Sequence, residues 1–239
     1  MTFPEYLIGQ TTDVMIRAQS KDAKFIGTSI GGARVVVKDA MTGEILAEGL
    51  TEGSTGDTDK IVKDPITRGK QLTDEDTAGF LAQLDIDEPT FVTVEVIAPW
   101  NKKQARVTSS TQLWVLPGKN ITGDGVVIEV PGFVVDILFP QTHERISSDK
   151  PVDITANVVM MCGCPLTSGG VWNADEYEVR AIVSKEGEKV QTFDLKIQEK
   201  PSTFKGSVNL SAGYYEVAVY AFDPKTGNSG LDKTNIIIQ

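Results

Sequence analysis

The chain is poor in the residues that most active sites need, since its 239 residues include one His and two Cys. A Ser-His-Asp triad would depend on His143, which lies in residues 141–145 with no nucleophile motif beside it. Metal centres that use two or more His ligands are excluded within one chain. Walker-type and Gly-x-Gly-x-x-Gly phosphate-binding motifs are absent. We therefore expect no catalytic residues and no enzyme activity.

Positive charge and long apolar runs are also scarce. The sequence has 23 Lys and Arg against 33 Asp and Glu, and its net charge of −10 repels nucleic acids and anionic membrane surfaces. No run approaches the roughly 18 consecutive apolar residues that span a bilayer. Residues 1–10 have neither the cationic start nor the long apolar stretch of an export leader. The chain is either cytoplasmic or a mature exported form whose leader was replaced by Met.

The abundant residues favour β-structure. Val and Thr together make up about a fifth of the chain, and branched side chains of this kind suit a pleated sheet. Residues 32–39 and 45–47 predict two strands of a hairpin, joined by a turn in which Gly43 can take a positive φ. Residues 52–70 are rich in Gly, Ser, Thr and Asp, which predicts a long surface loop.

One short helix is expected over residues 73–84. Residues 73–76 (Thr-Asp-Glu-Asp) form a weak capping box, and Phe80, Leu81 and Leu84 supply an apolar stripe. Further strands are predicted at residues 91–97, 106–116 and 126–130.

A domain boundary is expected near residue 133, because the strand pattern restarts after Pro131 and Gly132. The second part has seven short strands at the spacing of an immunoglobulin-like sandwich. They are predicted at residues 134–139, 152–160, 177–183, 190–197, 204–208, 214–222 and 234–238. The predicted fold is therefore all-β, with tandem β-sandwich domains at residues 1–132 and 133–239.

Two segments resemble known families. Residues 210–221 (Leu-Ser-Ala-Gly-Tyr-Tyr-Glu-Val-Ala-Val-Tyr-Ala) resemble a late strand of bacterial immunoglobulin-like and fibronectin type III-like domains, in which a Tyr at the position of Tyr215 anchors a corner. Residues 32–51 resemble the transthyretin-like, carboxypeptidase-regulatory-like sandwich, with its Asp-x-x-Thr-Gly turn at residues 39–43. These resemblances imply sandwiches used for binding and assembly, and a periplasmic or extracellular location.

Residues 160–165 (Met-Met-Cys-Gly-Cys-Pro) depart from the generic β pattern. Continued strand alternation would place Met160, Cys162 and Cys164 on one face. Thioether and thiolate groups suit Cu(I), so a copper site is one interpretation, with His143 as a fourth ligand if the fold brings it near. The other two interpretations are buried core residues and a disulfide between Cys162 and Cys164.

Two further sites are considered on weaker patterns. Trp172 follows a small-residue hinge at residues 166–170, which predicts a ring near the surface and makes Trp172 an interface candidate. Asp57 and Asp59 could offer oxygen ligands to calcium, although the EF-hand spacing is missing.

The sequence therefore predicts a non-catalytic binding or structural module with no cofactor. We expect its partner to be another protein or a second copy of the chain, within a larger assembly or surface structure. The alternative is a soft-metal carrier that holds copper at the Met-x-Cys-x-Cys segment.

Overall fold

The chain forms four β-sheets in two compact units, Met1–Val130 and Pro131–Gln239. This is seen in a computed structural model that describes residues 10–239. The sequence gives no sign of an export leader in residues 1–10. Residues 1–9 of this segment lie outside the described part of the chain. Among the described residues, no helix is both long and apolar enough to cross a membrane. The chain is all-β, as the sequence predicts.

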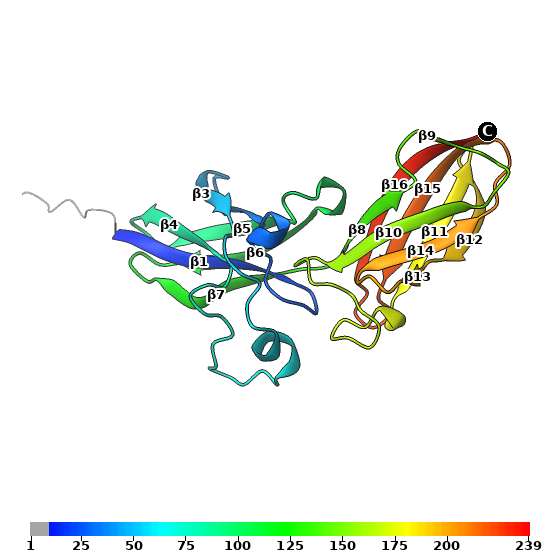
Figure 1. Ribbon diagram of the computed structural model, residues 1–239. Coiled ribbons are helices and arrows are strands. Elements are labelled where there is room, and N and C mark those ends of the chain that lie inside the picture. The colour runs from blue at the N-terminus through cyan, green and yellow to red at the C-terminus, as the bar shows by residue number, and fades with distance from the viewer. Residues whose placement is uncertain (1–9) are drawn as a thin grey trace, which may run out of the picture. The chain divides into compact units, whose positions relative to one another are not determined.

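The first unit has a three-stranded and a four-stranded sheet (Figure 1). The central strand of the smaller sheet, β1, pairs antiparallel with β4 and parallel with β7. The smaller sheet consists of β4 (Phe80–Ile86), β1 (Gln10–Ser20) and β7 (Ile121–Val130). The larger consists, in spatial order, of β3 (Ile45–Leu50), β2 (Arg34–Asp39), β5 (Thr90–Ala98) and β6 (Val107–Val115).

Period-two burial builds these strands. In β5, Val92, Val94 and Val96 are buried while the residues between them are partly exposed. The hairpin expected after residue 32 is confirmed as β2 and β3. Its turn is fixed by Asp39, whose Oδ1 accepts the Met41 and Thr42 amide protons at 2.7 Å each.

The helix predicted at residues 73–84 is wrong, because residues 80–86 form strand β4. The spacing of Phe80 and Leu84 fits one face of a helix and also one face of a strand, and pairing with β1 decides between them. The acidic residues before them form a turn, in which the Thr77 amide donates to the Asp74 carbonyl at 3.2 Å. The short helix of this unit is instead a π-helical turn, η2 (Asp59–Lys63), within the predicted loop.

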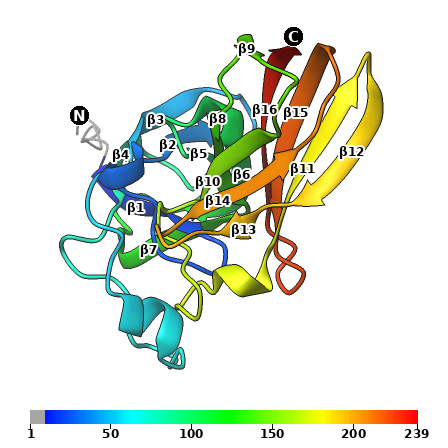
Figure 2. The ribbon, with the colours of Figure 1, turned by 45° about the vertical axis from the view of Figure 1, so that its right-hand side comes forward.

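The second unit contains a four-stranded and a five-stranded sheet, seen as two layers in Figures 1 and 2. Six of the seven strands predicted for this part are present, and the one predicted at residues 190–197 is divided between strands of different sheets, Glu188–Asp194 and Lys196–Ile197. One sheet is ordered β13 (Lys196–Ile197), β14 (Thr203–Val208), β10 (Val152–Met160) and β8 (Phe133–Phe139). The other is ordered β12 (Glu188–Asp194), β11 (Glu178–Lys185), β15 (Gly213–Phe222), β16 (Ser229–Ile238) and β9 (Glu144–Ile146).

This strand order is that of an immunoglobulin-like sandwich. In that fold the first, second, fourth and fifth strands form one sheet, and the remaining strands form the other. Tyr215 supplies the corner that its position predicts, since its hydroxyl donates to the Ser211 carbonyl at 3.0 Å and its side chain is buried. Short 3-10 turns complete the chain at η1 (Thr28–Ile30), η3 (Lys103–Ala105) and η4 (Ala174–Glu176).

Candidate functional site

The candidate site is the outer edge of strand β6 in the first unit (Figure 1). β6 ends the larger sheet and pairs with β5 over nine residue pairs, from Ala98–Val107 to Thr90–Val115, with no register shift. No described strand pairs with its other side. An edge strand presents a row of backbone N–H and C=O groups that another strand can use. The regular register means that this row is continuous along β6.

The composition of β6 distinguishes it from the other sheet edges. Its sequence, Val-Thr-Ser-Ser-Thr-Gln-Leu-Trp-Val, contains no charged residue, no Pro and no Gly. Proteins commonly protect edge strands from pairing with charges, Pro or bulges. Each of the seven other edge strands carries at least one charge: Glu48 in β3, Asp85 in β4, Asp124 in β7, Asp136 in β8, Glu144 in β9, Lys189 in β12 and Lys196 in β13. Among the described edges, β6 alone lacks this protection.

An exposed aromatic side chain marks one end of β6. Trp114 is 62% exposed, and its ring lies against Phe91 of β5 with 5.1 Å between ring centroids. Next to this pair, the Gln112 amide donates to the Thr93 hydroxyl at 2.9 Å. Trp is enriched in protein interfaces because it combines a large apolar area with a polar N–H. Trp114 therefore gives the edge an apolar anchor beside its backbone groups.

Four charged residues on the other strands of this sheet form ion pairs within the chain. Arg34 of β2 contacts Glu48 of β3 at 2.8 Å, and Lys38 of β2 contacts Glu95 of β5 at 2.6 Å. Both ion pairs are partly exposed, so each contributes little to stability. They do compensate four of the charges on the sheet beside the uncharged edge at β6.

The cysteine segment is a turn and does not extend strand β10. The Met160 amide donates to the Cys164 carbonyl at 3.1 Å, and the Gly163 amide donates to the Met160 carbonyl at 2.7 Å. The expected alignment of Met160, Cys162 and Cys164 along one strand face is therefore wrong, because the chain reverses after Met160. All three side chains are buried, and the two Sγ atoms lie 2.6 Å apart.

The structure does not bring together the four residues of the copper alternative. Strand β10 pairs Met160 with Phe133 at one end and Thr155 with Phe139 at the other, and His143 follows Phe139. His143 thus lies beyond the end of the sheet opposite the cysteines. Sulfur atoms 2.6 Å apart would subtend roughly 70° at a metal with bonds of about 2.3 Å, against about 109° in a tetrahedral site. Among the described residues, no group of three His, Cys, Asp or Glu side chains could hold a metal ion.

The prediction that Trp172 is exposed is wrong, since the residue is only 7% exposed. The preceding segment is not an open hinge, because it closes on itself. The Thr167 amide donates to the Trp172 carbonyl at 3.2 Å, and the Ala174 amide donates to the Thr167 carbonyl at 3.0 Å. Trp172 therefore does not present the exposed ring on which its candidacy as an interface residue depends.

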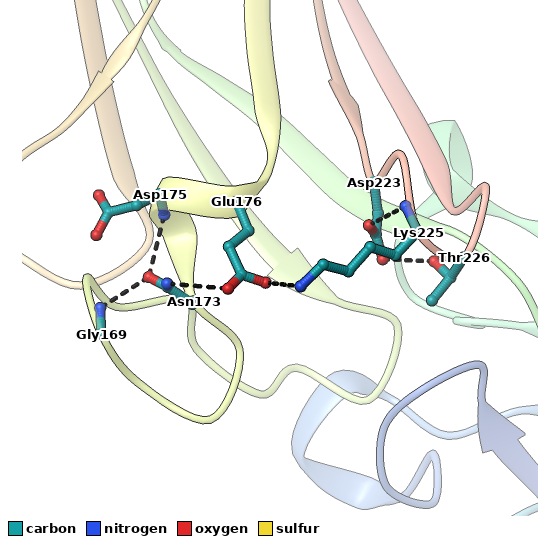
Figure 3. A network of polar contacts seen from close by, with 7 residues as sticks. All are labelled: Gly169, Asn173, Asp175, Glu176, Asp223, Lys225 and Thr226. Atoms are coloured by element: carbon teal, nitrogen blue, oxygen red, sulfur yellow. Dashed lines mark hydrogen bonds and ion pairs between the residues drawn. The ribbon is translucent and has the colours of Figure 1, made fainter.

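Acidic residues near this loop have structural roles (Figure 3). The Asn173 side-chain oxygen accepts two amide protons, from Gly169 at 2.7 Å and Asp175 at 3.2 Å, which caps η4. Glu176 forms an ion pair with Lys225 of the β15–β16 turn at 2.5 Å. The hydrogen bond from Lys225 lowers the pKa of Glu176. The network joins two loops of the second unit, and its ion pair favours the ionised form of Glu176.

The acids proposed for calcium also have partners within the loop. Asp57 Oδ1 accepts the amide protons of Asp59 at 2.8 Å and Lys60 at 3.0 Å. These hydrogen bonds lower the pKa of Asp57, and the bond from Lys60 has the larger effect. Asp59 pairs with Lys63 at 2.8 Å. Asp57 therefore acts as a cap for η2, and among residues 10–239 it belongs to no group of three His, Cys, Asp or Glu side chains that could hold a metal ion.

Comparison with known proteins leaves the family open. No protein-family profile and no curated protein matches the chain. Among solved structures, the fibronectin(III)-like modules of Clostridium thermocellum CbhA are 11% identical, with 100% of this chain and 93% of that chain covered and a TM-score of 0.32. An engineered protein is 18% identical, with 49% of this chain and 22% of that one covered and a TM-score of 0.35.

A third structure comprises three N-terminal domains of the bacteriophage RB49 highly immunogenic outer capsid protein. It is 14% identical, with 96% of this chain and 59% of that one covered and a TM-score of 0.30. At such identities and TM-scores, these matches establish neither a family nor a function.

Sequence reasoning missed the edge at β6. It predicts a strand at residues 106–116, but only the structure shows that Trp114 of this strand is exposed. The absence of charge over residues 107–116 was a visible signal. Its meaning depends on β6 being at the edge of its sheet, which follows only from the pairing order.

Proposed function

We propose that the chain is a non-catalytic protein-interaction module, a subunit of a larger assembly or surface structure, that binds by adding a strand to β6. The observation that carries this proposal is the uncharged nine-residue edge with exposed Trp114 at one end. Backbone hydrogen bonds along the edge would supply affinity, and the Trp114 ring would help to select the partner.

The sequence of β6 favours a second copy of the chain as the partner. Two β6 strands that pair antiparallel about a two-fold axis at Thr111 form an interface in which the same surface is used twice. This register places Trp114 opposite Thr108 and Gln112 opposite Ser110. No like charges then face each other across the pair, and like charges directly opposite would be destabilising.

The state of two carboxyl groups, Asp39 and Asp153, is not that of a catalytic acid. Hydrogen bonds from the backbone amides of Thr42 and Met41 lower the pKa of Asp39, and a hydrogen bond from Lys205 lowers the pKa of Asp153. A catalytic acid at neutral pH needs the opposite, a carboxyl whose pKa is raised by burial or by a neighbouring carboxylate. These carboxylates are instead held ionised by local bonds.

Two finer assignments belong to the same proposal. We assign the first unit to the transthyretin-like class, supported by the β2–β3 hairpin with its Asp39–Gly43 turn and by the pair of sheets around it. We place the protein outside the cytoplasm, in the periplasm or beyond, where sandwich modules of both resembled classes serve in assembly.

Sedimentation equilibrium of the full chain over a wide concentration range tests the proposal. We expect wild type to form dimers, and Thr111→Lys to weaken dimerisation by about tenfold or more, because the two-fold axis brings the new ammonium groups face to face. Thr111→Val, which keeps a branched side chain of similar size, should dimerise like wild type.

Val190→Lys is the matched control, because it adds the same charge to the exposed edge strand β12 of the second unit. It should leave dimerisation unchanged, and thermal unfolding should show that all variants are folded. A wild-type chain that stays monomeric at every concentration, or a Thr111→Lys variant that dimerises as wild type does, contradicts pairing through β6.

A further inference from the structure

The turn after β10 holds two cysteines side by side. Residues 161–163 form a three-residue loop between Met160 and Cys164, whose backbones are joined by the Met160 N–H to Cys164 C=O hydrogen bond of 3.1 Å. Loops of this length commonly end in a residue in the left-handed region, and Gly163 has a φ of 81°. Because Gly163 turns the chain in this way, the side chains on either side of it can converge.

Backbone contacts and burial together hold the two sulfur atoms close to each other. The Gly163 amide donates to the Met160 carbonyl at 2.7 Å, and Val159 forms a β-bridge with Pro165 just beyond the turn. Cys162 is 1% exposed and Cys164 is 6% exposed, so neither side chain can swing into solvent without opening the turn. The fold therefore keeps the two Sγ atoms next to each other.

We propose that Cys162 and Cys164 are a dithiol–disulfide couple that the folded turn favours in its oxidised form. A disulfide needs its two sulfur atoms brought together, and the ladder bonds around the turn do this before the covalent bond forms. In the unfolded chain the same two residues lack these bonds. The couple is independent of the edge at β6, which belongs to the other unit.

The oxidation step requires a disulfide-type oxidant, for which oxidised glutathione serves as the probe. One cysteine sulfur attacks the glutathione disulfide, forms a mixed disulfide and releases one glutathione thiol. The second cysteine sulfur then displaces the other glutathione and closes the Cys162–Cys164 bond. Two electrons pass to glutathione, and the two cysteine protons end on the two glutathione thiols.

The effect of folding on the disulfide also determines the effect of the disulfide on the stability of the protein. If folding raises the equilibrium ratio of disulfide to dithiol by some factor, the disulfide raises the folding equilibrium constant by the same factor. The oxidised protein should therefore be the more stable form, and an oxidising compartment would favour it.

The experiment compares the couple in native buffer and in concentrated urea. The full chain is equilibrated in glutathione buffers from both the reduced and the oxidised side, including refolding in the buffer, so that burial cannot block the reagent. After acid quenching and alkylation, mass spectrometry gives the ratio of disulfide to dithiol. We expect this ratio to be about tenfold higher in the native protein. An equal or lower ratio in the native protein overturns the proposal.

Single-cysteine variants separate the internal disulfide from other adducts. Cys162→Ser and Cys164→Ser should each carry glutathione on the remaining cysteine when they are oxidised in urea, whereas refolded wild type should hold none, because its second sulfur displaces it. Glutathione accumulating on wild type would overturn the proposal. If either variant fails to fold, the ratio of disulfide to dithiol in wild type, compared between native buffer and urea, tests the proposal by itself.

Discussion

At the scale of single residues, two charged side chains fix a long irregular segment of the first unit. The Asp124 carboxylate of β7 accepts the Thr73 amide at 2.9 Å and the Thr73 hydroxyl at 2.7 Å, as well as the Leu72 amide. Arg17 of β1 is 5% exposed and donates to the carbonyls of Thr77 and Ala78. The chain between η2 and β4 is thus held by long-range polar contacts where regular secondary structure is lacking.

Asp124 should make stability depend on pH. Partial burial raises the pKa of Asp124, but hydrogen bonds from Thr73 and Leu72 and the charge of Arg17 lower it by more, so the pKa lies below its ordinary value. A lowered carboxyl pKa stabilises the fold above the unfolded value of about 4, and this contribution is lost as pH falls through the folded pKa.

Asp124→Asn should remove this contribution. We expect the variant to lose about 1 kcal/mol of unfolding free energy at neutral pH and to respond less steeply than wild type to acid between about pH 5 and pH 3. Urea denaturation at several pH values measures both quantities. Identical pH profiles for wild type and variant would show that Asp124 does not act through its charge.

Tyr215→Phe tests the corner of the second unit. The substitution removes the hydroxyl that donates to the Ser211 carbonyl and should lower the unfolding free energy by about 1 kcal/mol. Tyr214→Phe is the control, because Tyr214 is 72% exposed and should tolerate the change. Equal effects of the two substitutions in urea denaturation would argue against a corner role.

At the scale of elements, the β2–β3 hairpin depends on the backbone of its turn. Gly43 has a φ of 78°, and a Cβ added there would meet no atom within 4 Å. Gly43→Ala should therefore cost about 1 kcal/mol through backbone strain alone. Gly43→Asn should cost less, because Asn tolerates the left-handed region better. A lower melting temperature for Gly43→Asn than for Gly43→Ala would contradict this explanation.

Strand β4 shows where local pattern is insufficient. Phe80 and Leu84 are four residues apart, a spacing that a helix face and a strand face both satisfy. In the structure Ala82, Leu84 and Ile86 are buried while Leu81 is 44% exposed, which is period-two burial. Pairing with β1 supplies the backbone hydrogen bonds that make the strand the stable choice.

At the scale of the whole molecule, each unit has its own buried core. Ile16 of β1 and Ile154 of β10 are both fully buried, one in each unit. Ile16→Ala and Ile154→Ala should each cost about 2–5 kcal/mol, and each should shift only the unfolding of its own unit. Calorimetry of the full chain measures this. A single transition that both substitutions shift equally would mean that the chain unfolds as one cooperative body.

The sequence by itself determined the properties that repeat along single strands. Alternating burial in β5 and β10, the Asp39–Gly43 turn and the Tyr215 corner each depend on residues close together in the chain, so their pattern is visible before folding. The all-β class follows from the same local preferences.

The tertiary structure decided everything that depends on which strands become neighbours. It placed β6 at an edge, put His143 beyond the end of the β8–β10 pair opposite Cys162, buried Trp172 and made a strand of residues 80–86. Strand order results from the sum of contacts between distant segments, and no local period encodes that sum. The uncharged edge at β6 therefore became visible only in the folded chain.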